Sequence, residues 1–180
     1  MAIHIETERL FIRELEPADA EGMFAMDSDP EVHRYVGNTP VEQIGQTREV
    51  IDFIRAQYLE FGIGRWAIIE KSSGDFAGWI GHKRAMETTN GHSGYVDFGY
   101  RLAHRFWGRG YATEAGHAVL HYGIETLGLT DIFATTDVDN TASRRVLEKL
   151  GFTFVELFKW EGPSGWRHEG QPTTWYKLPQ

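Results

Sequence analysis

Residues 95–110 of this chain read Tyr-Val-Asp-Phe-Gly-Tyr-Arg-Leu-Ala-His-Arg-Phe-Trp-Gly-Arg-Gly, and the fold is organised around this stretch. Its first eight residues alternate between the two faces of an extended chain, which predicts a β-strand. The residues from 111 onward read Tyr-Ala-Thr-Glu-Ala and predict the start of a helix. Between strand and helix, two glycines lie among arginines at 105–110. This arrangement suits a bound phosphate, because glycines allow close backbone approach and a helix start attracts anions.

Two common nucleotide-binding patterns do not match these glycines. A Walker loop ends in Gly-Lys-Ser/Thr, whereas this chain continues Gly-Tyr-Ala from position 110. A dinucleotide fingerprint requires Gly or Ala at position 113, which is threonine here. Arg105 and Arg109 are suited to donate charge-assisted hydrogen bonds to an anion. A glycine-rich turn without any ligand is the alternative interpretation.

The composition restricts the classes of function. With 180 residues, 41% of them hydrophobic and 24% charged, the chain is expected to form a single domain over 1–180. It has no cysteine, which excludes disulfides, thiol nucleophiles and cysteine–zinc sites. The net charge of −8 argues against binding to nucleic acid. No apolar run approaches the roughly 20 residues of a membrane span and no signal-peptide pattern is present, so we expect a cytoplasmic protein.

Apolar periodicity predicts the remaining elements. We expect further strands at about 4–15, 65–71, 75–83, 131–137, 152–158 and 173–178, and helices at about 17–26, 44–61, 111–128 and 140–150. Residues 32–40 are expected to be irregular, and Gly128 is expected to end the central helix. The loop at 160–170 carries Trp160, Trp166 and His168, which either cover the sheet or contact a substrate.

A second motif follows the first by about thirty residues, at the start of the last predicted helix. Asn140 and Ser143 are three residues apart and therefore project from one helical face. Asn140 is equally suited to be a simple N-cap. Six basic residues flank the two motifs and are explained by a polyanionic ligand or by ordinary surface charge: Arg101, Arg105, Arg109, Arg144, Arg145 and Lys149.

Both motifs are similar to those of the GNAT superfamily of N-acetyltransferases. Arg105-x-x-Gly108-x-Gly110 resembles the pyrophosphate-binding signature of that superfamily, and the Asn140 helix with its Lys-x-Gly-Phe ending resembles the end of its cofactor site. Two stretches, Thr-Glu-Arg-Leu from position 7 and Tyr-Ala-Thr-Glu-Ala from position 111, resemble the Rim-type branch of ribosomal-protein N-terminal acetyltransferases. The resemblance runs from residue 8 to 158. It implies an α/β (α+β) GNAT fold, in which a mixed sheet of about seven strands is flanked by helices.

The resemblance implies an N-acetyltransferase that moves an acetyl group from acetyl-CoA to a primary amine in a ternary complex. A protein N-terminal α-amine is one acceptor, and the alternatives are a small-molecule amine, such as a drug or polyamine, or a non-catalytic acyl-CoA-binding module. A monomer and a homodimer both remain open. The implied cofactor-binding residues are Phe98, Gly99, Tyr100, Arg105, Gly108, Arg109, Gly110, Tyr111, Ala112, Asn140 and Ser143.

Asp97 and Ser143 are the candidate catalytic residues. Rim-type enzymes often carry Glu at the position of Asp97, where a carboxylate takes the amine proton through water, and a structural role is the alternative. Many GNAT enzymes protonate the thiolate with a Tyr seven residues after the helix Asn, but that position is Leu147 here. The remaining candidates for protonating the thiolate are Ser143, or water in an enzyme that acts largely by positioning its substrates. Gly99 is expected to form a bulge. We expect no metal, because His117 and His121 lack the Glu of a zinc-protease motif.

Overall fold

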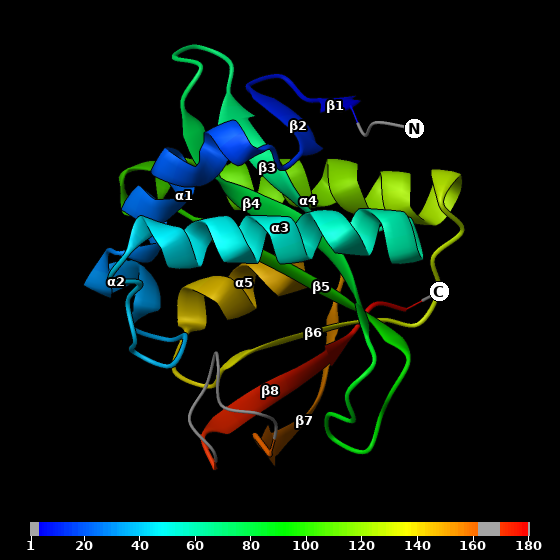
Figure 1. Ribbon diagram of the computed structural model, residues 1–180. Coiled ribbons are helices and arrows are strands. Elements are labelled where there is room, and N and C mark those ends of the chain that lie inside the picture. The colour runs from blue at the N-terminus through cyan, green and yellow to red at the C-terminus, as the bar shows by residue number, and fades with distance from the viewer. Residues whose placement is uncertain (1–3, 162–169, 180) are drawn as a thin grey trace.

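The computed structural model describes residues 4–161 and 170–179. Its centre is one mixed sheet in the order β1-β2-β3-β4-β5-β6-β8-β7 (Figure 1), as the fold class predicted. The strands are β1 (His4–Glu6), β2 (Leu10–Glu14), β3 (Arg65–Glu70), β4 (Phe76–Ala85), β5 (Tyr95–Leu102), β6 (Ile132–Asp137), β7 (Thr153–Lys159) and β8 (Pro172–Lys177). The helices are α1 (Ala20–Asp27), α2 (Pro30–His33), α3 (Ile44–Phe61), α4 (Tyr111–His121) and α5 (Thr141–Lys149). Among these strands only β5 and β6 pair in parallel.

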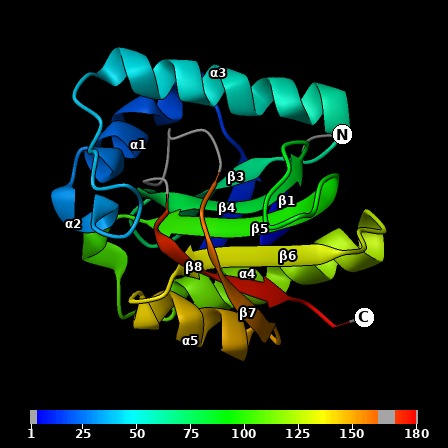
Figure 2. The same cartoon turned by 90° about the horizontal axis from the view of Figure 1, so that it is seen from below.

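Helices cover both faces of the sheet. Helices α1 and α3 lie over one face, and α4 and α5 lie over the other (Figure 2). Met26 and Ile51 pack on Ala67 beneath the first pair, while Trp66 and Val119 belong to the core under α4. Ala67 and Trp66 are neighbours in β3, so successive strand residues face opposite helical layers. No helix of the described residues is long and apolar enough to cross a membrane.

The strand expected at 4–15 is two strands, which raises the number of strands to eight. A tight turn joins β1 and β2, in which the Thr7 N–H donates to the Leu10 oxygen at 3.0 Å and the Leu10 N–H donates to Thr7 Oγ1 at 3.0 Å. The Thr7 hydroxyl also donates to Glu114 Oε1 on α4, at 2.6 Å. Sequence alternation alone gives no sign of this turn, because Glu114, which holds it, lies 107 positions away.

The region around Pro30 also differs from expectation. The helix expected at 17–26 begins as a 3-10 turn at Pro17–Asp19 and continues as α1. Residues 32–40 are not wholly irregular, because α2 begins at Pro30. The Asp29 side chain accepts a hydrogen bond from the Glu31 N–H at 2.9 Å, so Asp29 caps α2 and Pro30 is its first residue.

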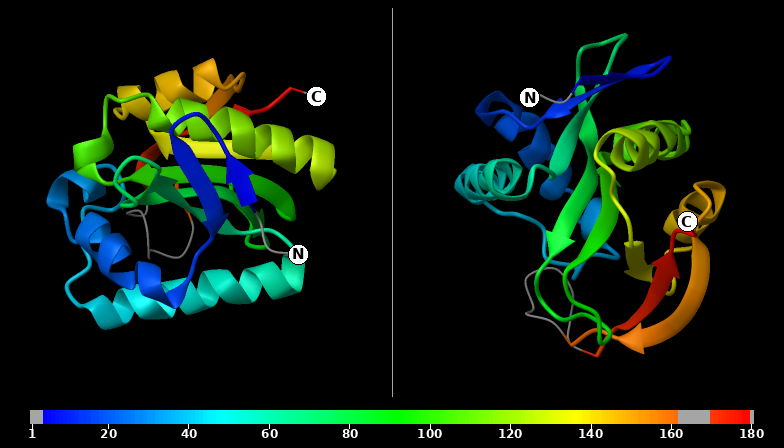
Figure 3. Two further views of the ribbon diagram at one scale, coloured as in Figure 1. Left: turned by 90° about the horizontal axis from the view of Figure 1, so that it is seen from above. Right: turned by 90° about the vertical axis from the view of Figure 1, so that its right-hand side faces the viewer.

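Strands β5 and β6 diverge, and this divergence creates the site. They pair only at Val96–Ile132 and Asp97–Phe133, after which β6 continues beside β8. In the right-hand view of Figure 3, β7 and β8 lie well apart from the part of the sheet formed by β3, β4 and β5. The edge of β5 beyond Asp97 therefore has no partner strand among the described residues, and its backbone groups are free to bind a ligand.

Helix α4 ends in a π-helical turn at Tyr122–Thr126 with an identifiable cause. The fully buried His82 ring lies against this turn, and a Cβ on Gly123 would be 2.5 Å from its Nε2. His82 Nε2 also lies 3.3 Å from the Val119 oxygen, inside the helical hydrogen-bond ladder. A side chain inserted there widens the helix locally. Gly128 follows with φ +62°, which confirms the expected helix end.

Candidate active site

The loop before α4 has the geometry of an anion site. Gly108 and Gly110 adopt φ +72° and +80°, values that glycine accepts without strain, and Gly110 is the cap residue of α4. A Cβ at Gly108 would meet nothing within 4 Å, so the loop is open on that side. The Glu114 N–H donates to the Gly110 oxygen at 3.0 Å and is the first to have an acceptor within the helix. The N–H groups of Tyr111, Ala112 and Thr113 therefore remain available at the helix start.

The two arginines of this loop pair with acids of the β3–β4 hairpin. Arg105 Nη2 lies 3.1 Å from Asp75 Oδ2, and Arg109 Nη1 lies 3.2 Å from Glu70 Oε1. The Arg105–Asp75 pair is exposed on both sides, with side chains 62% and 46% exposed, and such a pair contributes only about 0–1 kcal/mol. Arg109 is 49% exposed, but its partner Glu70 is only 9% exposed. Arg105 is thus the arginine held weakly enough to exchange a carboxylate for a phosphate.

Tyr111 joins the loop to β3. Its hydroxyl donates to Glu70 Oε1 at 2.5 Å, and this hydrogen bond lowers the pKa of Glu70 and raises the pKa of Tyr111. The side chain thus secures the first residue of α4 against β3. Ala112, the next residue, is buried.

Gly99 does not form the expected bulge. It pairs in register with Gly81 across β4 and β5, and the ladder continues through Ile80 and Tyr100. A Cβ on Gly99 would lie 2.9 Å from Arg65 Nη2, so any larger residue here would displace that guanidinium. The opening beside β5 arises at its other edge, where β6 turns away.

Asp97 lies on the α3 side of β5, where Arg65 holds it. Arg65 Nη2 forms an ion pair with the carboxylate, and Arg65 Nη1 donates to the Asp97 main-chain oxygen at 2.9 Å. Their side chains are only 12% exposed for Arg65 and 21% for Asp97. Sequence reasoning missed Arg65, because nothing within the β3 sequence marks it as the partner of a residue 32 positions later.

Tyr100 and Ser143 meet on the opposite side of β5. The Tyr100 hydroxyl donates to Ser143 Oγ at 3.2 Å, which joins β5 to α5. The Ser143 N–H donates to Asn140 Oδ1 at 3.1 Å, so Asn140 is the N-cap of this helix. Burial raises the pKa of the Tyr100 phenol, although the bond to Ser143 opposes this effect. Leu147, one helical turn further, lies in the core.

The six clustered basic residues do not form one patch. Arg101 is buried and pairs with Asp27 of α1 at 2.7 Å, so it faces away from the anion loop. The Arg144 guanidinium donates to a tyrosine hydroxyl of β8 at 3.2 Å. Arg105 and Arg109 lie within the loop itself. Basic residues that are close together in the sequence therefore lie in different parts of the fold.

Two further expectations concern residues outside this site. His117 and His121 are exposed on α4, and the described part of the chain contains no group of three or more potential metal ligands. Trp166 and His168 lie outside the described residues. The Trp160 N–H donates to the Gln171 oxygen at 3.2 Å, which starts the pairing of β7 with β8.

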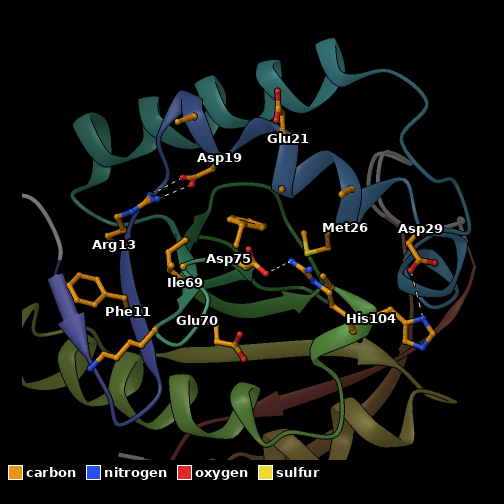
Figure 4. Close-up of a pocket in the computed structure, with 18 of the residues that line it drawn as sticks. Phe11, Arg13, Asp19, Glu21, Met26, Asp29, Ile69, Glu70, Asp75 and His104 are labelled. Atoms are coloured by element: carbon orange, nitrogen blue, oxygen red, sulfur yellow. Dashed lines mark hydrogen bonds and ion pairs between the residues drawn. The ribbon is translucent and has the colours of Figure 1, made fainter.

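An open groove of about 1090 Å³ lies between α1 and the β3–β4 hairpin (Figure 4). Arg13 and Asp19 point toward one another on its wall, and Arg105 reaches it from the anion loop. Asp97 and Ser143 do not line it. The groove is therefore distinct from the region where β5 and β6 diverge.

Comparison with known proteins identifies the class. Residues 9–153 match the family model of the acetyltransferase (GNAT) domain. The uncharacterized N-acetyltransferase YoaA of Bacillus subtilis (strain 168) is 36% identical over 149 residues, which are 82% of this chain and 81% of that protein. The FsC-acetyl coenzyme A-N(2)-transacetylase of Aspergillus fumigatus is 30% identical over 173 residues, 93% of this chain and 73% of that protein. The structure of RimL, the ribosomal L7/L12 alpha-N-protein acetyltransferase, with coenzyme A has a TM-score of 0.79 at 14% identity, covering 97% of each chain.

The chain therefore belongs to the GNAT acetyltransferase family, as its two motifs predicted. Within that family it is an acetyl-CoA-dependent N-acetyltransferase. The similarity to RimL supports the shared fold.

Proposed function

We propose that this enzyme acetylates a primary amine in a ternary complex with acetyl-CoA and belongs to the Rim-type branch. One arrangement carries the acetyl-CoA part of the proposal. The loop at 108–110 follows β5 and starts α4, and Tyr100 of β5 contacts Ser143 of the Asn140-capped helix, beside the stretch of β5 that β6 leaves unpaired. The RimL fold is consistent with the branch, and the name of the Aspergillus relative is consistent with an acetyl-CoA donor and a nitrogen acceptor.

The residues present fit the proposed donor. The loop is open at Gly108, and the N–H groups of the first α4 turn are suited to pyrophosphate. Arg105 and Arg109 add charge to that position. The edge of β5 that β6 leaves unpaired, at Phe98, Gly99 and Tyr100, suits the amide-containing pantetheine arm, and Tyr100 contacts Ser143 there. When bound, acetyl-CoA supplies the activated acetyl group and the thiolate leaving group.

The placement of Asp97 and Ser143 suits the two proton transfers. Asp97 lies on the α3 face of β5, while Ser143 and Tyr100 lie on the α5 face. We assign Asp97 to accept the amine proton through water as the N–C bond forms, with Arg65 keeping the carboxylate in place. We assign Ser143 to donate to the sulfur as the C–S bond breaks. Because Tyr100 donates to Ser143 Oγ, the serine proton is free to point toward another acceptor.

A protein N-terminal α-amine and a small-molecule amine are the two acceptor classes, since the donor-side residues serve both. Release of free CoA thiol distinguishes them when measured with acetyl-CoA and a panel of short peptides, polyamines and amine drugs. Thiol release that requires a free α-amine on a peptide supports the Rim-type assignment. Release with small amines alone contradicts it, and binding of acetyl-CoA without release for any amine indicates a non-catalytic module.

A further inference from the structure

The two stretches that resemble Rim-type enzymes, 7–10 and 111–115, meet at a single carboxylate. Glu114 Oε1 accepts from the Thr7 hydroxyl at 2.6 Å and from the Arg9 N–H at 2.9 Å. Glu114 Oε2 accepts from Arg9 Nε at 2.7 Å and pairs with Arg9 Nη2 at 2.6 Å. The β1–β2 turn is therefore fixed to the first turn of α4.

The Arg9 guanidinium, which binds the Glu114 carboxylate, also contacts the anion loop. Its Nη1 donates to the main-chain oxygen of Arg109 at 2.9 Å, and its guanidinium lies 4.7 Å from the centre of the Tyr111 ring. The position of a Cβ on Gly110 would be 3.5 Å from Arg9 Nη2. The guanidinium thus connects Glu114 to the peptide that joins Arg109 and Gly110.

That peptide determines where an anion binds. In a planar trans peptide the C=O and the following N–H point in opposite directions. Because Arg9 holds the Arg109 oxygen on its own side, the Gly110 N–H is directed away from Arg9. A left-handed glycine has many alternative conformations, so the peptide needs such an external restraint.

The charges of Arg9 and Glu114 indicate that this pair orients the loop rather than adding charge to it. Burial alone would raise the pKa of Glu114, but the hydrogen bonds from Thr7 and Arg9 outweigh burial and lower it, so the carboxylate is ionised. The Glu114 side chain is 17% exposed and that of Arg9 is 44% exposed. Together they are neutral, so the pair adds little net charge to the loop and acts through the contacts that it makes.

We infer that Arg9, fixed by Glu114, is a positioning residue that orients the Arg109–Gly110 peptide toward the pyrophosphate of acetyl-CoA. This inference rests on the proposed donor site and assigns a common purpose to the two Rim-like stretches. Arg9 itself needs no contact with the ligand.

Glu114→Gln tests the inference by the sign of its effect. Positioning predicts weaker binding of acetyl-CoA, by about tenfold in Kd and KM, with kcat at saturating acetyl-CoA changed less than twofold. If only charge mattered, removing a carboxylate beside a polyanion site would tighten binding. Arg9→Lys keeps the charge but loses the planar fork, and we expect it to weaken binding as Arg9→Gln does. Unchanged or tighter binding in Glu114→Gln, or wild-type binding in Arg9→Lys, overturns the inference.

Arg13→Gln is the matched control. Arg13 lies in β2, donates to both Asp19 oxygens at 2.8 Å and to the Glu14 oxygen at 2.9 Å, and so makes a similar set of bonds away from the loop. We expect its Kd for acetyl-CoA to equal that of the wild type, while its thermal stability falls by an amount comparable to that of Glu114→Gln.

Should Glu114→Gln fail to fold, Arg9→Lys at a partly exposed position gives the same comparison. If the wild-type enzyme does not bind acetyl-CoA, the donor site itself is refuted. If the wild type binds acetyl-CoA and the Arg9 and Glu114 variants bind it equally well, only the role of Arg9 is refuted.

Discussion

The hydroxyl of Tyr100 donates a hydrogen bond to Ser143 Oγ at 3.2 Å, and this contact joins the unpaired edge of β5 to the start of α5. The two residues lie 43 positions apart in the chain, yet both border the point where β6 leaves β5. A buried phenol whose pKa is raised by burial remains a donor at neutral pH. Within the proposed mechanism we therefore assign Tyr100 to orient Ser143.

We expect Ser143→Ala to lower kcat by about 10²-fold, because it removes the proposed proton donor to the sulfur. Tyr100→Phe should lower kcat by about tenfold, and the double variant should resemble Ser143→Ala, since Tyr100 acts through the serine. Steady-state rates of thiol release check this order. Tyr95→Phe, in the same strand, serves as a control that should leave kcat unchanged. Multiplicative losses in the double variant would show that the two hydroxyls act independently.

Asp97→Asn keeps the shape of the side chain and removes its capacity to accept a proton. We expect kcat to fall by about 10²-fold or more while the Kd for acetyl-CoA changes little. Asp52→Asn, at an exposed position on α3, controls for the loss of one negative charge. Near-wild-type turnover of Asp97→Asn would assign Asp97 a structural role as the partner of Arg65.

At the proposed donor site, we expect the acids of the β3–β4 hairpin to compete with acetyl-CoA for Arg105 and Arg109. Asp75→Asn releases Arg105 from its 3.1 Å ion pair and should tighten acetyl-CoA binding by about two- to fivefold, in keeping with an exposed pair. Titration calorimetry at low and high salt checks this, with Asp52→Asn again matching the change in net charge. Equal affinities for the Asp75 and Asp52 variants would mean that Arg105 does not reach the ligand.

His82 makes the stability of the enzyme depend on pH. Burial lowers the pKa of His82 from its ordinary 6.5 to about 4. Above pH 6.5 the ring is neutral in the folded and the unfolded chain. Between pH 6.5 and 4 only the unfolded chain binds the proton, so the free energy of unfolding falls as the pH falls, by about 2 kcal/mol at pH 5.

His82→Gln retains a donor toward the Val119 oxygen but does not titrate. We expect urea unfolding at pH 7.5 and pH 5 to show a smaller loss of stability in this variant than in the wild type. The difference between the two proteins isolates His82 from the other titrating groups. An equal loss of stability in the variant and the wild type would mean that the folded protein binds a proton at His82 with the ordinary pKa of histidine.

The parts of the site that sequence could predict are local. The left-handed Gly108 and Gly110 and the helix after them follow from residue types at fixed spacing, and so does the N-cap Asn140. The alternation of β5 likewise places Asp97 and Tyr100 on opposite faces. Each of these features depends on residues that are only a few positions apart in the sequence.

The parts that sequence could not predict are contacts between distant segments. Arg65 pairs with Asp97 and lies against Gly99, a glycine for which the sequence alone predicted a bulge. Arg101 belongs by position to the anion cluster, but strand alternation and Asp27 bury it under α1. In both cases an ion pair with a residue far away in the sequence, on another strand for Asp97 and on α1 for Arg101, decides the role of the side chain, and such pairings leave no periodic signal in one sequence.

Thermal unfolding with and without acetyl-CoA tests the central claim most directly. At a hundred times its Kd the ligand should stabilise the wild type by about 2.7 kcal/mol, a rise in Tm of roughly 5–10 °C for a chain of this size. Gly110→Ala, which strains a backbone at φ +80°, and Arg109→Ala should reduce the shift, because both alter the anion loop. Arg13→Gln should keep the full shift. The absence of any shift in the wild type at saturating acetyl-CoA, or an undiminished shift in both loop variants, would contradict the assignment of residues 105–110 as the pyrophosphate site.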